Sequence, residues 1–300
     1  MTLSPLKKAN MLMFLVVFFW GMSYLFTKQG LHTLPVFNFI VLRFGIGFIA
    51  AVLIFPRHFS KINKKTIKGG AILGFFLFLA IFGLNYGIQF TTISNAGFLG
   101  SMTVLFVPIL SAIFFRKFPE KKIIAACLSA VIGIALLTLN SAAGVGLGDL
   151  VCLVAASTYA SHIIITKRLN DTKGMDTLNL GISQLGFTAL YALFFSIIFE
   201  TPHLPTTTDA WISVLFLGIL CSAFGFISQV VAQKYTTPAH VGLIFALEPV
   251  FAAFFASVFA GEKLFLIQIV GAAIVFMSVI FVQVDIKEWI QKRKTKKESV

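Results

Sequence analysis

The sequence predicts an all-α membrane protein with ten transmembrane helices, arranged as two inverted repeats of five helices. Three observations lead to this fold class. Of the 300 residues, 58% are apolar or aromatic and only 12% are charged, whereas a soluble domain carries about 25% charged residues. The apolar residues form continuous runs, and a bilayer is crossed by about 20 of them per helix. Finally, polar and glycine positions of the first half recur in the same order in the second half.

Ten apolar runs are separated by charged residues, proline, glycine or Asn/Asp turns. They cover residues 10–30, 36–55, 69–90, 94–115, 121–139, 148–167, 176–199, 211–234, 239–259 and 264–284. Backbone N–H groups in lipid must be paired within the segment, so each run is predicted as a helix. The lack of apolar/polar alternation argues against a closed barrel. The first run is too long for the apolar core of a signal peptide and is therefore taken as the first span.

Basic residues gather on one side of these ten helices. With both termini placed in the cytoplasm, 21 of the 24 Lys and Arg residues fall in cytoplasmic segments. This bias follows the positive-inside rule, so we expect a multi-pass protein of the plasma membrane with both termini cytoplasmic. The basic tail is expected to anchor on an anionic leaflet, with a regulatory or partner-binding role as the alternative. The net charge of +13 then reflects topology, and no nucleic-acid partner is expected.

An internal repeat divides the chain into residues 1–140 and 141–285, followed by the tail, residues 286–300. The matches are Thr27-Lys28 with Thr166-Lys167, Asn38 and Gly45 with Asn179 and Gly186, Leu73-Gly74 with Leu217-Gly218, Asn85 and Gln89 with Gln229 and Gln233, Thr91-Thr92 with Thr236-Thr237, and Pro108 with Pro249. Their order is collinear, and the offset drifts only from 139 to 145. Since five helices per half is an odd number, the second half must cross the membrane inverted. Many secondary transporters share this plan, with the binding site between the repeats.

Short motifs also occur in a fixed order along the two halves. They are Phe19-Trp20-Gly21, Leu42-Arg43-Phe44, Gly148-Asp149-Leu150, Glu248-Pro249-Val250-Phe251, Gly261-Glu262-Lys263 and Gly271-Ala272-Ala273. With these motifs the chain resembles the EamA family of the drug/metabolite transporter superfamily over nearly its whole length. In the first half, Phe118-Pro119-Glu120-Lys121 stands where a Gly-Glu turn is common in that family. The resemblance implies a ten-helix transporter that exports amino acids or small, often amphipathic metabolites, without naming a substrate.

Paired amides recur in the two halves. Asn85 and Gln89 are four residues apart, so they are expected to share one helix face, and Gln229 and Gln233 repeat the spacing. Buried amides in lipid must be paired. They are expected either to join neighbouring helices by hydrogen bonds or to line a polar cavity that binds the substrate.

Aromatic side chains near the middle of the spans form a second candidate group. They are Trp20 and Tyr24 in span one, Tyr86 in span three and Tyr159 in span six. Aromatic packing explains such residues in a chain with 35 Phe. The alternative is an aromatic pocket that stacks on flat or cationic substrates.

Three of the ionisable side chains inside predicted helices are candidates for a role in transport. Arg43 and Glu248 lie near the middle of spans two and nine, where such groups are costly unless they are paired or functional. They are expected either to form a structural ion pair or to couple transport, with Glu248 exchanging a proton. Lys28, near the outer end of span one, is expected to snorkel to the interface, with contact to a substrate carboxylate as the alternative.

Neither an enzyme nor a metalloprotein is expected. Gly146-Leu147-Gly148-Asp149 matches the GxGD motif of intramembrane aspartyl proteases, but no second Asp lies inside a span to share a proton. His162 and His240 lack further ligands at metal-binding spacing. The three cysteines lie in apolar runs without CxxC spacing. We therefore expect no catalytic residue, no metal and no cofactor.

The sequence thus predicts a secondary transporter that exports amino acids or related small metabolites across the plasma membrane by alternating access. Its expected partners are a small-molecule substrate and the lipid bilayer. Coupling to protons, and a monomeric or homodimeric state, are left open. The substrate site is expected between spans one, three, six, eight and nine. The alternatives are an intramembrane enzyme and a membrane scaffold or sensor that transports nothing.

Overall fold

The computed structural model describes residues 4–91, 93–116, 118–138, 146–261 and 264–283, and these ranges contain helices and no strand. The first half holds α1 (Pro5–Leu31), α2 (Val36–Ile54), α3 (Pro56–Phe59), α4 (Lys64–Gly87), α5 (Ile93–Ser101), α6 (Thr103–Phe115) and α7 (Lys121–Thr138). The second half holds α8 (Leu147–Asn170), α9 (Thr177–Phe199), α10 (Thr208–Phe216), the π-helix η1 (Leu217–Phe226), α11 (Ile227–Gln233), α12 (Pro238–Phe245), α13 (Glu248–Ala260) and α14 (Leu266–Gln283).

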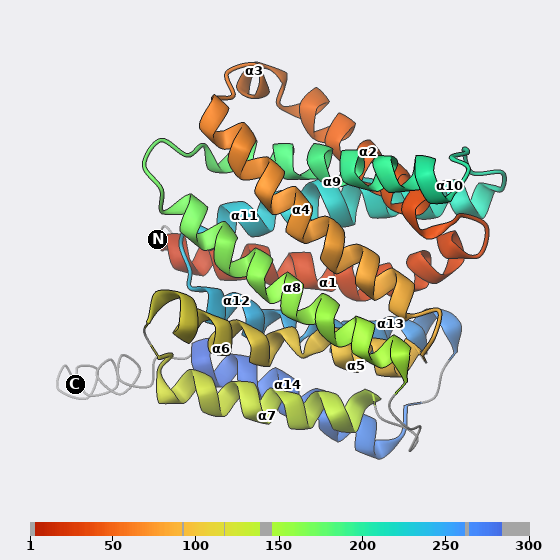
Figure 1. The fold of residues 1–300 in the computed structure, drawn as a ribbon. Coiled ribbons are helices and arrows are strands. Elements are labelled where there is room, and N and C mark those ends of the chain that lie inside the picture. Colours follow the sequence, from red (N-terminus) through yellow and green to blue (C-terminus); the bar gives the residue numbers. More distant parts are fainter. Residues whose placement is uncertain (1–3, 92, 117, 139–145, 262–263, 284–300) are drawn as a thin grey trace, which may run out of the picture.

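The long helices lie side by side as one bundle, and the start of α1 and the end of α14 lie at the same end of it (Figure 1). Nine helical segments in the described part of the chain are long and apolar enough to cross a membrane, and 266–282 forms a shorter apolar helix. The prediction of an all-helical membrane protein is confirmed at this level. Glu262, Lys263 and the predicted tail, residues 286–300, lie outside the described residues.

Two helices begin several residues before their predicted apolar runs. α1 starts at Pro5 and α4 at Lys64, because Ser4 and Asn63 cap them by accepting hydrogen bonds from the backbone N–H groups of Lys7 and Thr66. Lysine side chains in these first turns can reach polar surroundings while their stems pack on apolar surface. The apolar pattern therefore marks the lipid-covered part of a helix and not its full length.

Three of the predicted continuous spans are interrupted helices. The run 94–115 divides into α5 and α6, and the run 239–259 divides into α12 and α13 around Ala246 and Leu247. Each half therefore has one divided span, and Pro108 and Pro249 each follow the break. The run 211–234 contains the ten-residue π-helix η1 between two α-helical pieces. π-Helices are rare and occur frequently at functional sites.

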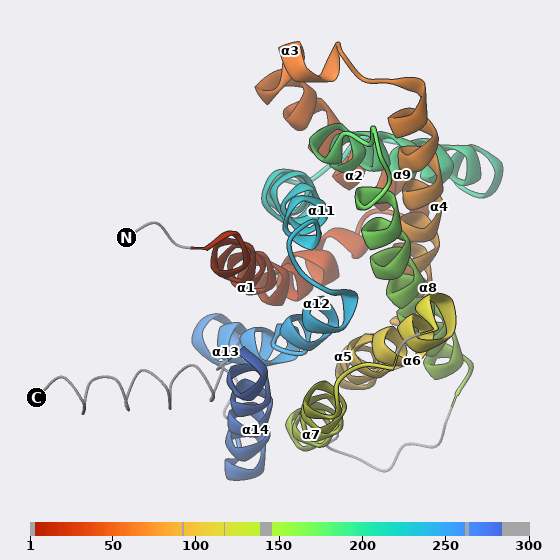
Figure 2. The ribbon, with the colours of Figure 1, turned by 90° about the vertical axis from the view of Figure 1, so that its left-hand side faces the viewer.

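The helices pack in pairs that cross between the two halves. α4 packs on α8 and α9, α2 on α9 and η1, α1 on α13, and α7 on α14. Figure 2 shows α7 and α14 stacked at one side of the bundle, away from α2 and α9. The α7–α14 contact depends on Gly133 and Gly271, since a Cβ at Gly133 would lie 2.7 Å from the carbonyl oxygen of Gly271, and one at Gly271 would lie 2.6 Å from that of Gly133.

Two asparagines, one at the start of α2 and one at the start of α9, each bond to the segment that follows the other helix. Asn38, at the start of α2, donates from Nδ2 to the carbonyl oxygen of His203 (2.8 Å), and Asn179, at the start of α9, donates to that of His58 (3.0 Å). At the His58 end, Asp176 caps α9. Burial acts to raise the pKa of Asp176, but hydrogen bonds from His58 and Asn179 outweigh it and hold the pKa below its usual value.

Candidate functional site

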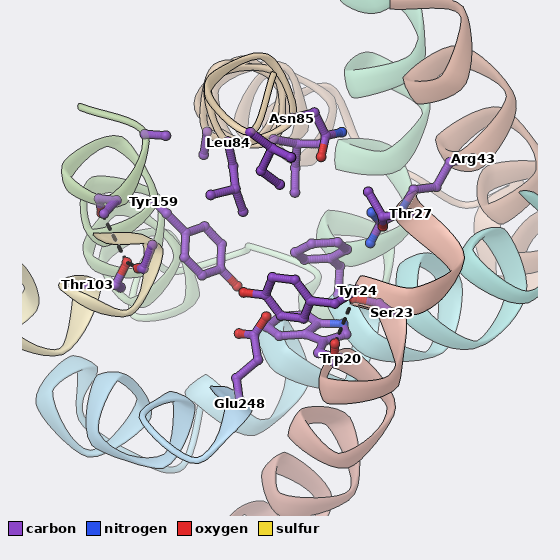
Figure 3. Close-up of a pocket in the computed structure, with 17 residues that line it drawn as sticks. Trp20, Ser23, Tyr24, Thr27, Arg43, Leu84, Asn85, Thr103, Tyr159 and Glu248 are labelled. Carbon is purple, nitrogen blue, oxygen red and sulfur yellow. Dashed lines mark hydrogen bonds between the residues drawn. The ribbon is translucent and has the colours of Figure 1, made fainter. Parts of the chain in front are cut away.

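A cavity of about 100 Å³ is lined by residues of α1, α2, α4, α5, α6, α8, η1 and α13 (Figure 3). This volume exceeds what one water molecule needs. Six of the residues singled out from the sequence line the cavity: Trp20, Tyr24, Arg43, Asn85, Tyr159 and Glu248. These six come from both halves of the chain, so folding brings together side chains that are up to 228 positions apart in the sequence.

The break in span nine positions Glu248 in this cavity. The N–H groups of Ala246 and Leu247 bond to carbonyls only three residues back, and α13 then begins at Glu248. Pro249 has no N–H to donate, which suits the first turn of a helix. A carboxylate in that turn is stabilised by the unpaired N–H groups and the helix dipole. The Tyr24 hydroxyl lies within hydrogen-bonding reach of the Glu248 carboxylate.

Aromatic rings close one side of the cavity, which we call the floor and define as Trp20, Tyr159, Phe226 and Phe245. The Trp20 ring centroid lies 4.8 Å from that of Phe226 and 5.0 Å from that of Phe245, and the Tyr159 ring stacks on Phe245 at 5.9 Å. Trp20 is fixed by its Nε1–H, which donates to the carbonyl oxygen of Cys221 in η1 (2.9 Å). The floor therefore joins α1, α8, η1 and α12.

Arg43 reaches the cavity from α2 and is only 5% exposed. Its Nε–H donates to the Ser222 hydroxyl (3.0 Å), and its guanidinium carbon lies 5.4 Å from the centroid of the Phe44 ring. No carboxylate oxygen of the described residues lies within 4 Å of the guanidinium. Arg43 and Glu248 thus line one cavity without forming the direct ion pair that the sequence allowed.

Asn85 lines the cavity from α4, and its amide points inward (Figure 3). The side chain is 4% exposed, and its Nδ2 atom has no hydrogen-bond partner among the described residues. Gln89 does not share this position. The prediction that the two amides lie on one helix face is wrong, because α4 ends at Gly87 and Gln89 follows in an exposed turn.

The second amide pair lies beyond the floor. Gln229 and Gln233 are fully buried on one face of α11, where Gln229 Nε2 donates to Gln233 Oε1 (3.4 Å). Gln229 Oε1 accepts from the Tyr159 hydroxyl (3.0 Å), and Gln233 Nε2 donates to the carbonyl oxygen of Ile163 (3.1 Å). These amides have protein partners and do not line the cavity in this conformation.

The remaining candidates lie away from the cavity. Lys28 is exposed, and Tyr86 is 37% exposed and packs on Phe82 and Phe90. Asp149, the acid of the GxGD motif, accepts from the backbone N–H of Gly146 and from the Thr91 hydroxyl, so it caps the start of α8. His162 is fully buried against Gln184 Oε1 (2.9 Å). Among the described residues, no three His, Cys, Asp or Glu side chains are grouped as metal ligands.

Sequence reasoning missed three hydroxyl residues of the cavity wall: Ser23, Thr27 and Thr103. Two of them bond to backbone carbonyls within a turn, Ser23 to Trp20 and Thr103 to Gly100. Hydroxyls that satisfy themselves in this way are common in membrane helices, so the residue type alone does not distinguish them. For Ser23 and Thr27 a helical projection is a signal that could have found them, since they share one face of α1 with Trp20 and Tyr24. No such signal marks Thr103.

Both halves of the chain match the model of the EamA-like transporter family, over residues 7–139 and 146–284. The Bacillus subtilis (strain 168) protein "Uncharacterized transporter YoaV" is 29% identical over 273 residues, covering 87% of this chain and 91% of that protein. The Salmonella typhimurium protein "Probable amino-acid metabolite efflux pump" is 27% identical over 286 residues, covering 90% and 92%. A solved crystal structure shares the fold with a TM-score of 0.77 at 19% identity, covering 92% of this chain and 96% of that chain.

Proposed function

This chain belongs to the EamA-like transporter family, and from that premise we propose that it exports amino acids or related small metabolites across the plasma membrane by alternating access. The observation that carries the proposal is the cavity, which is lined from both halves by one acid, Glu248, one base, Arg43, and two further polar residues, Asn85 and Tyr24. A purely structural bundle has no reason to keep such groups around an internal space, because buried polar groups are costly unless they are paired.

The architecture we propose has ten spans in two inverted repeats, residues 1–140 and 141–285, with the basic tail, residues 286–300, in the cytoplasm. Three features support inversion. The divided spans occupy corresponding places in the two halves, and α7 and α14 meet at Gly133 and Gly271. Asn38 and Asn179 make the same contact at opposite ends of the α2–α9 pair. A two-fold axis in the membrane plane relates features in this way.

The conformation described here is the outward-facing one in this proposal. The cavity-lining residues of α4 lie in its last turns, towards the end that the charge bias makes extracellular, and the floor lies on the cytoplasmic side of the cavity. Opening to the cytoplasm then requires the floor to separate. In that state Gln229 would line the cavity, as Asn85 does here, because it is the repeat counterpart of Asn85. Gln233, the counterpart of Gln89, would follow it on the same face of α11. Tyr86, Gln89 and Lys28 would act nearer the outer mouth.

Counterflow in proteoliposomes tests the function. Vesicles that contain the purified protein and are loaded with an unlabelled amino acid are expected to accumulate the labelled amino acid from outside. Vesicles without the protein are not expected to accumulate it. A panel of amino acids and amines gives the substrate class. If the folded protein moves no compound of a broad metabolite panel, transport is contradicted, and a scaffold or sensor function remains as the explanation.

Glu248 is the residue we propose to exchange a proton. If transport is proton-coupled through this carboxyl, Glu248→Gln abolishes the dependence of counterflow on a pH gradient, because the amide cannot carry a proton across the cycle. Asp149→Asn is the matched control, since this acid caps α8 outside the cavity. A Glu248→Gln protein that keeps its full response to the gradient would reject the role.

A further inference from the structure

One part of the cavity wall carries hydrogen-bond donors that have no acceptor among the described residues. Arg43 uses its Nε–H on Ser222, and the structure records no partner for its four Nη–H groups among the described residues. Asn85, whose Nδ2 is unpartnered, and the hydroxyl residue Thr27 line the same cavity (Figure 3). No carboxylate oxygen of the described residues lies within 4 Å of this guanidinium, and a ligand anion would supply the close partner that a largely buried charge favours. Carboxylates match the planar donor fork of arginine.

The opposite wall has the complementary chemistry. The Glu248 carboxylate points into the cavity beside the ring of Tyr159, with Tyr24 and Trp20 close by (Figure 3). Aromatic faces together with a carboxylate are the surroundings that an ammonium group prefers in a site with little water. A third part of the lining, on α4, is apolar and consists of Ala80, Ile81, Leu84 and Ile88.

We propose that the cavity selects dipolar ions, binding the ligand carboxylate at Arg43 and Asn85 and the ligand ammonium at Glu248, with an apolar side chain packed on α4. The ligand class is therefore neutral, apolar α-amino acids, and singly charged amines or acids of the same shape are excluded. This inference rests on the transport function proposed above and assigns the charged subsites within it. Arg43 and Glu248 form no direct salt bridge with each other, and the ligand would give each of them an oppositely charged partner.

The assignment also explains how one carboxylate can serve two roles. A proton and a ligand ammonium group cannot both occupy Glu248, so binding of one displaces the other. Arg43 takes no part in that exchange, because its guanidinium stays protonated in proteins. Arg43 therefore binds the ligand carboxylate only, whereas Glu248 binds either the ligand ammonium or a proton. Removing the charge of Arg43 should favour amines over acids, and removing that of Glu248 should favour acids over amines.

The test uses three matched compounds in the counterflow assay with the full-length protein. L-leucine carries both charged groups, 3-methylbutylamine is leucine without its carboxylate, and 4-methylpentanoate is leucine without its amino group. We expect wild-type protein to exchange leucine at least about tenfold faster than either analogue, because each analogue leaves one buried charged group unpaired.

Variants at the two walls should change selectivity in opposite directions. Arg43→Gln is expected to lose at least about tenfold in leucine exchange and to accept 3-methylbutylamine, since the carboxylate partner is gone. Glu248→Gln is expected to lose leucine similarly and to accept 4-methylpentanoate. Asn85→Asp gives a second test of the donor wall if Arg43→Gln fails to fold, because its added negative charge repels the carboxylate. Lys68→Gln, at an exposed cation near the start of α4 and outside the cavity, is the control and should leave the ranking of the compounds unchanged.

Three outcomes would overturn the assignment. Wild-type protein could exchange other metabolites but not leucine, or could exchange the amine as fast as leucine. Alternatively, the variants at both walls could lower exchange of all three compounds equally, as a purely structural role predicts. Each of these leaves transport itself intact. A wild-type protein that moves nothing in a broad panel contradicts the transport function instead, so the two failures are distinguishable.

Discussion

Arg116 adopts a left-handed backbone conformation, with φ of 52°, at the end of α6, and no other non-glycine residue among those described has a positive φ. Gly261 ends α13 in the same way, with φ of 67°. The two positions correspond in the repeat. Glycine adopts this region without strain, whereas a side chain costs about 1–2 kcal/mol there. The first half therefore keeps the turn without the glycine that would favour it.

Replacing Arg116 by glycine should stabilise the protein. We expect Arg116→Gly to raise the free energy of unfolding by up to about 1 kcal/mol, measured as an upward shift of the thermal unfolding midpoint in detergent. Gly261→Ala is the matched reverse change and should lower the midpoint. An Arg116→Gly protein with an unchanged or lower midpoint would show that the arginine side chain has a stabilising contact that exceeds the backbone strain.

Gln229 is fully buried and accepts the hydrogen bond of Tyr159, which belongs to the floor of the cavity. Gln229→Leu removes this acceptor, and the buried tyrosine hydroxyl is left unpaired at a cost of about 1–3 kcal/mol. We expect normal expression and a substrate affinity lower by about tenfold, measured as the half-saturating concentration in counterflow. Tyr159→Phe is the companion variant, because it removes the hydroxyl that donates this hydrogen bond and leaves Gln229 in place. Unchanged kinetics in Gln229→Leu would exclude a role in binding.

At the scale of elements, the contact between α7 and α14 depends on a glycine in each helix. A Cβ at Gly271 meets the Gly133 carbonyl oxygen at 2.6 Å and the Leu137 backbone nitrogen at 2.7 Å, both below the separation of real Cβ contacts. Backbone atoms cannot move aside as a flexible side chain does. This pair therefore tolerates no side chain at either position unless the helices separate.

Adding a methyl group at this contact should destabilise the protein without touching the cavity. Gly271→Ala is expected to cost about 1–3 kcal/mol through overpacking, read as a lower thermal midpoint. Gly45→Ala in α2 is the control, because a Cβ there meets nothing within 4 Å. It should be neutral or stabilising by the helix propensity of alanine, about 0.5–1 kcal/mol. Equal midpoints for the two variants would contradict the tight α7–α14 packing.

At the scale of the whole molecule, inversion of the halves can be tested from the two asparagine contacts. His58 and His203 each present a backbone carbonyl to an asparagine of the other half, and both side chains are exposed. In an inverted repeat these two positions lie on opposite sides of the membrane. The three native cysteines are buried, so labelling at new cysteines has a low background.

We expect a membrane-impermeant thiol reagent to label His203→Cys in intact cells and His58→Cys only after permeabilisation. Labelling of both positions from one side would reject the inverted arrangement, and the reversed pattern would place both termini outside.

Much of this fold follows from hydrophobic runs, because lipid exposure demands unbroken apolar surface and internal backbone pairing. The same rule conceals the interruptions, because the sequence around Ala246 and Leu247 is as apolar as its surroundings. Pro249 indicates a bend there, but the division of the span into two helices that presents Glu248 is seen only in the structure. The cavity was predicted through residues that are unusual in lipid, such as Arg43 and Asn85. Gln89 was misplaced because the end of α4 at Gly87 is set by packing and not by composition.

The π-helix η1 gives span eight a way to rotate its C-terminal end. A π-helical stretch holds a surplus of chain relative to an α-helix of the same rise, and that surplus can migrate along a span without breaking it. A shift of one residue in the register between η1 and α11 turns α11 by about 100° about its axis. Such a turn would rotate Gln229 and Gln233 out of their buried hydrogen bonds while α10 stays anchored. Span eight therefore contains a segment in which the helix can change its register, and this segment lies directly beside the ring of Trp20.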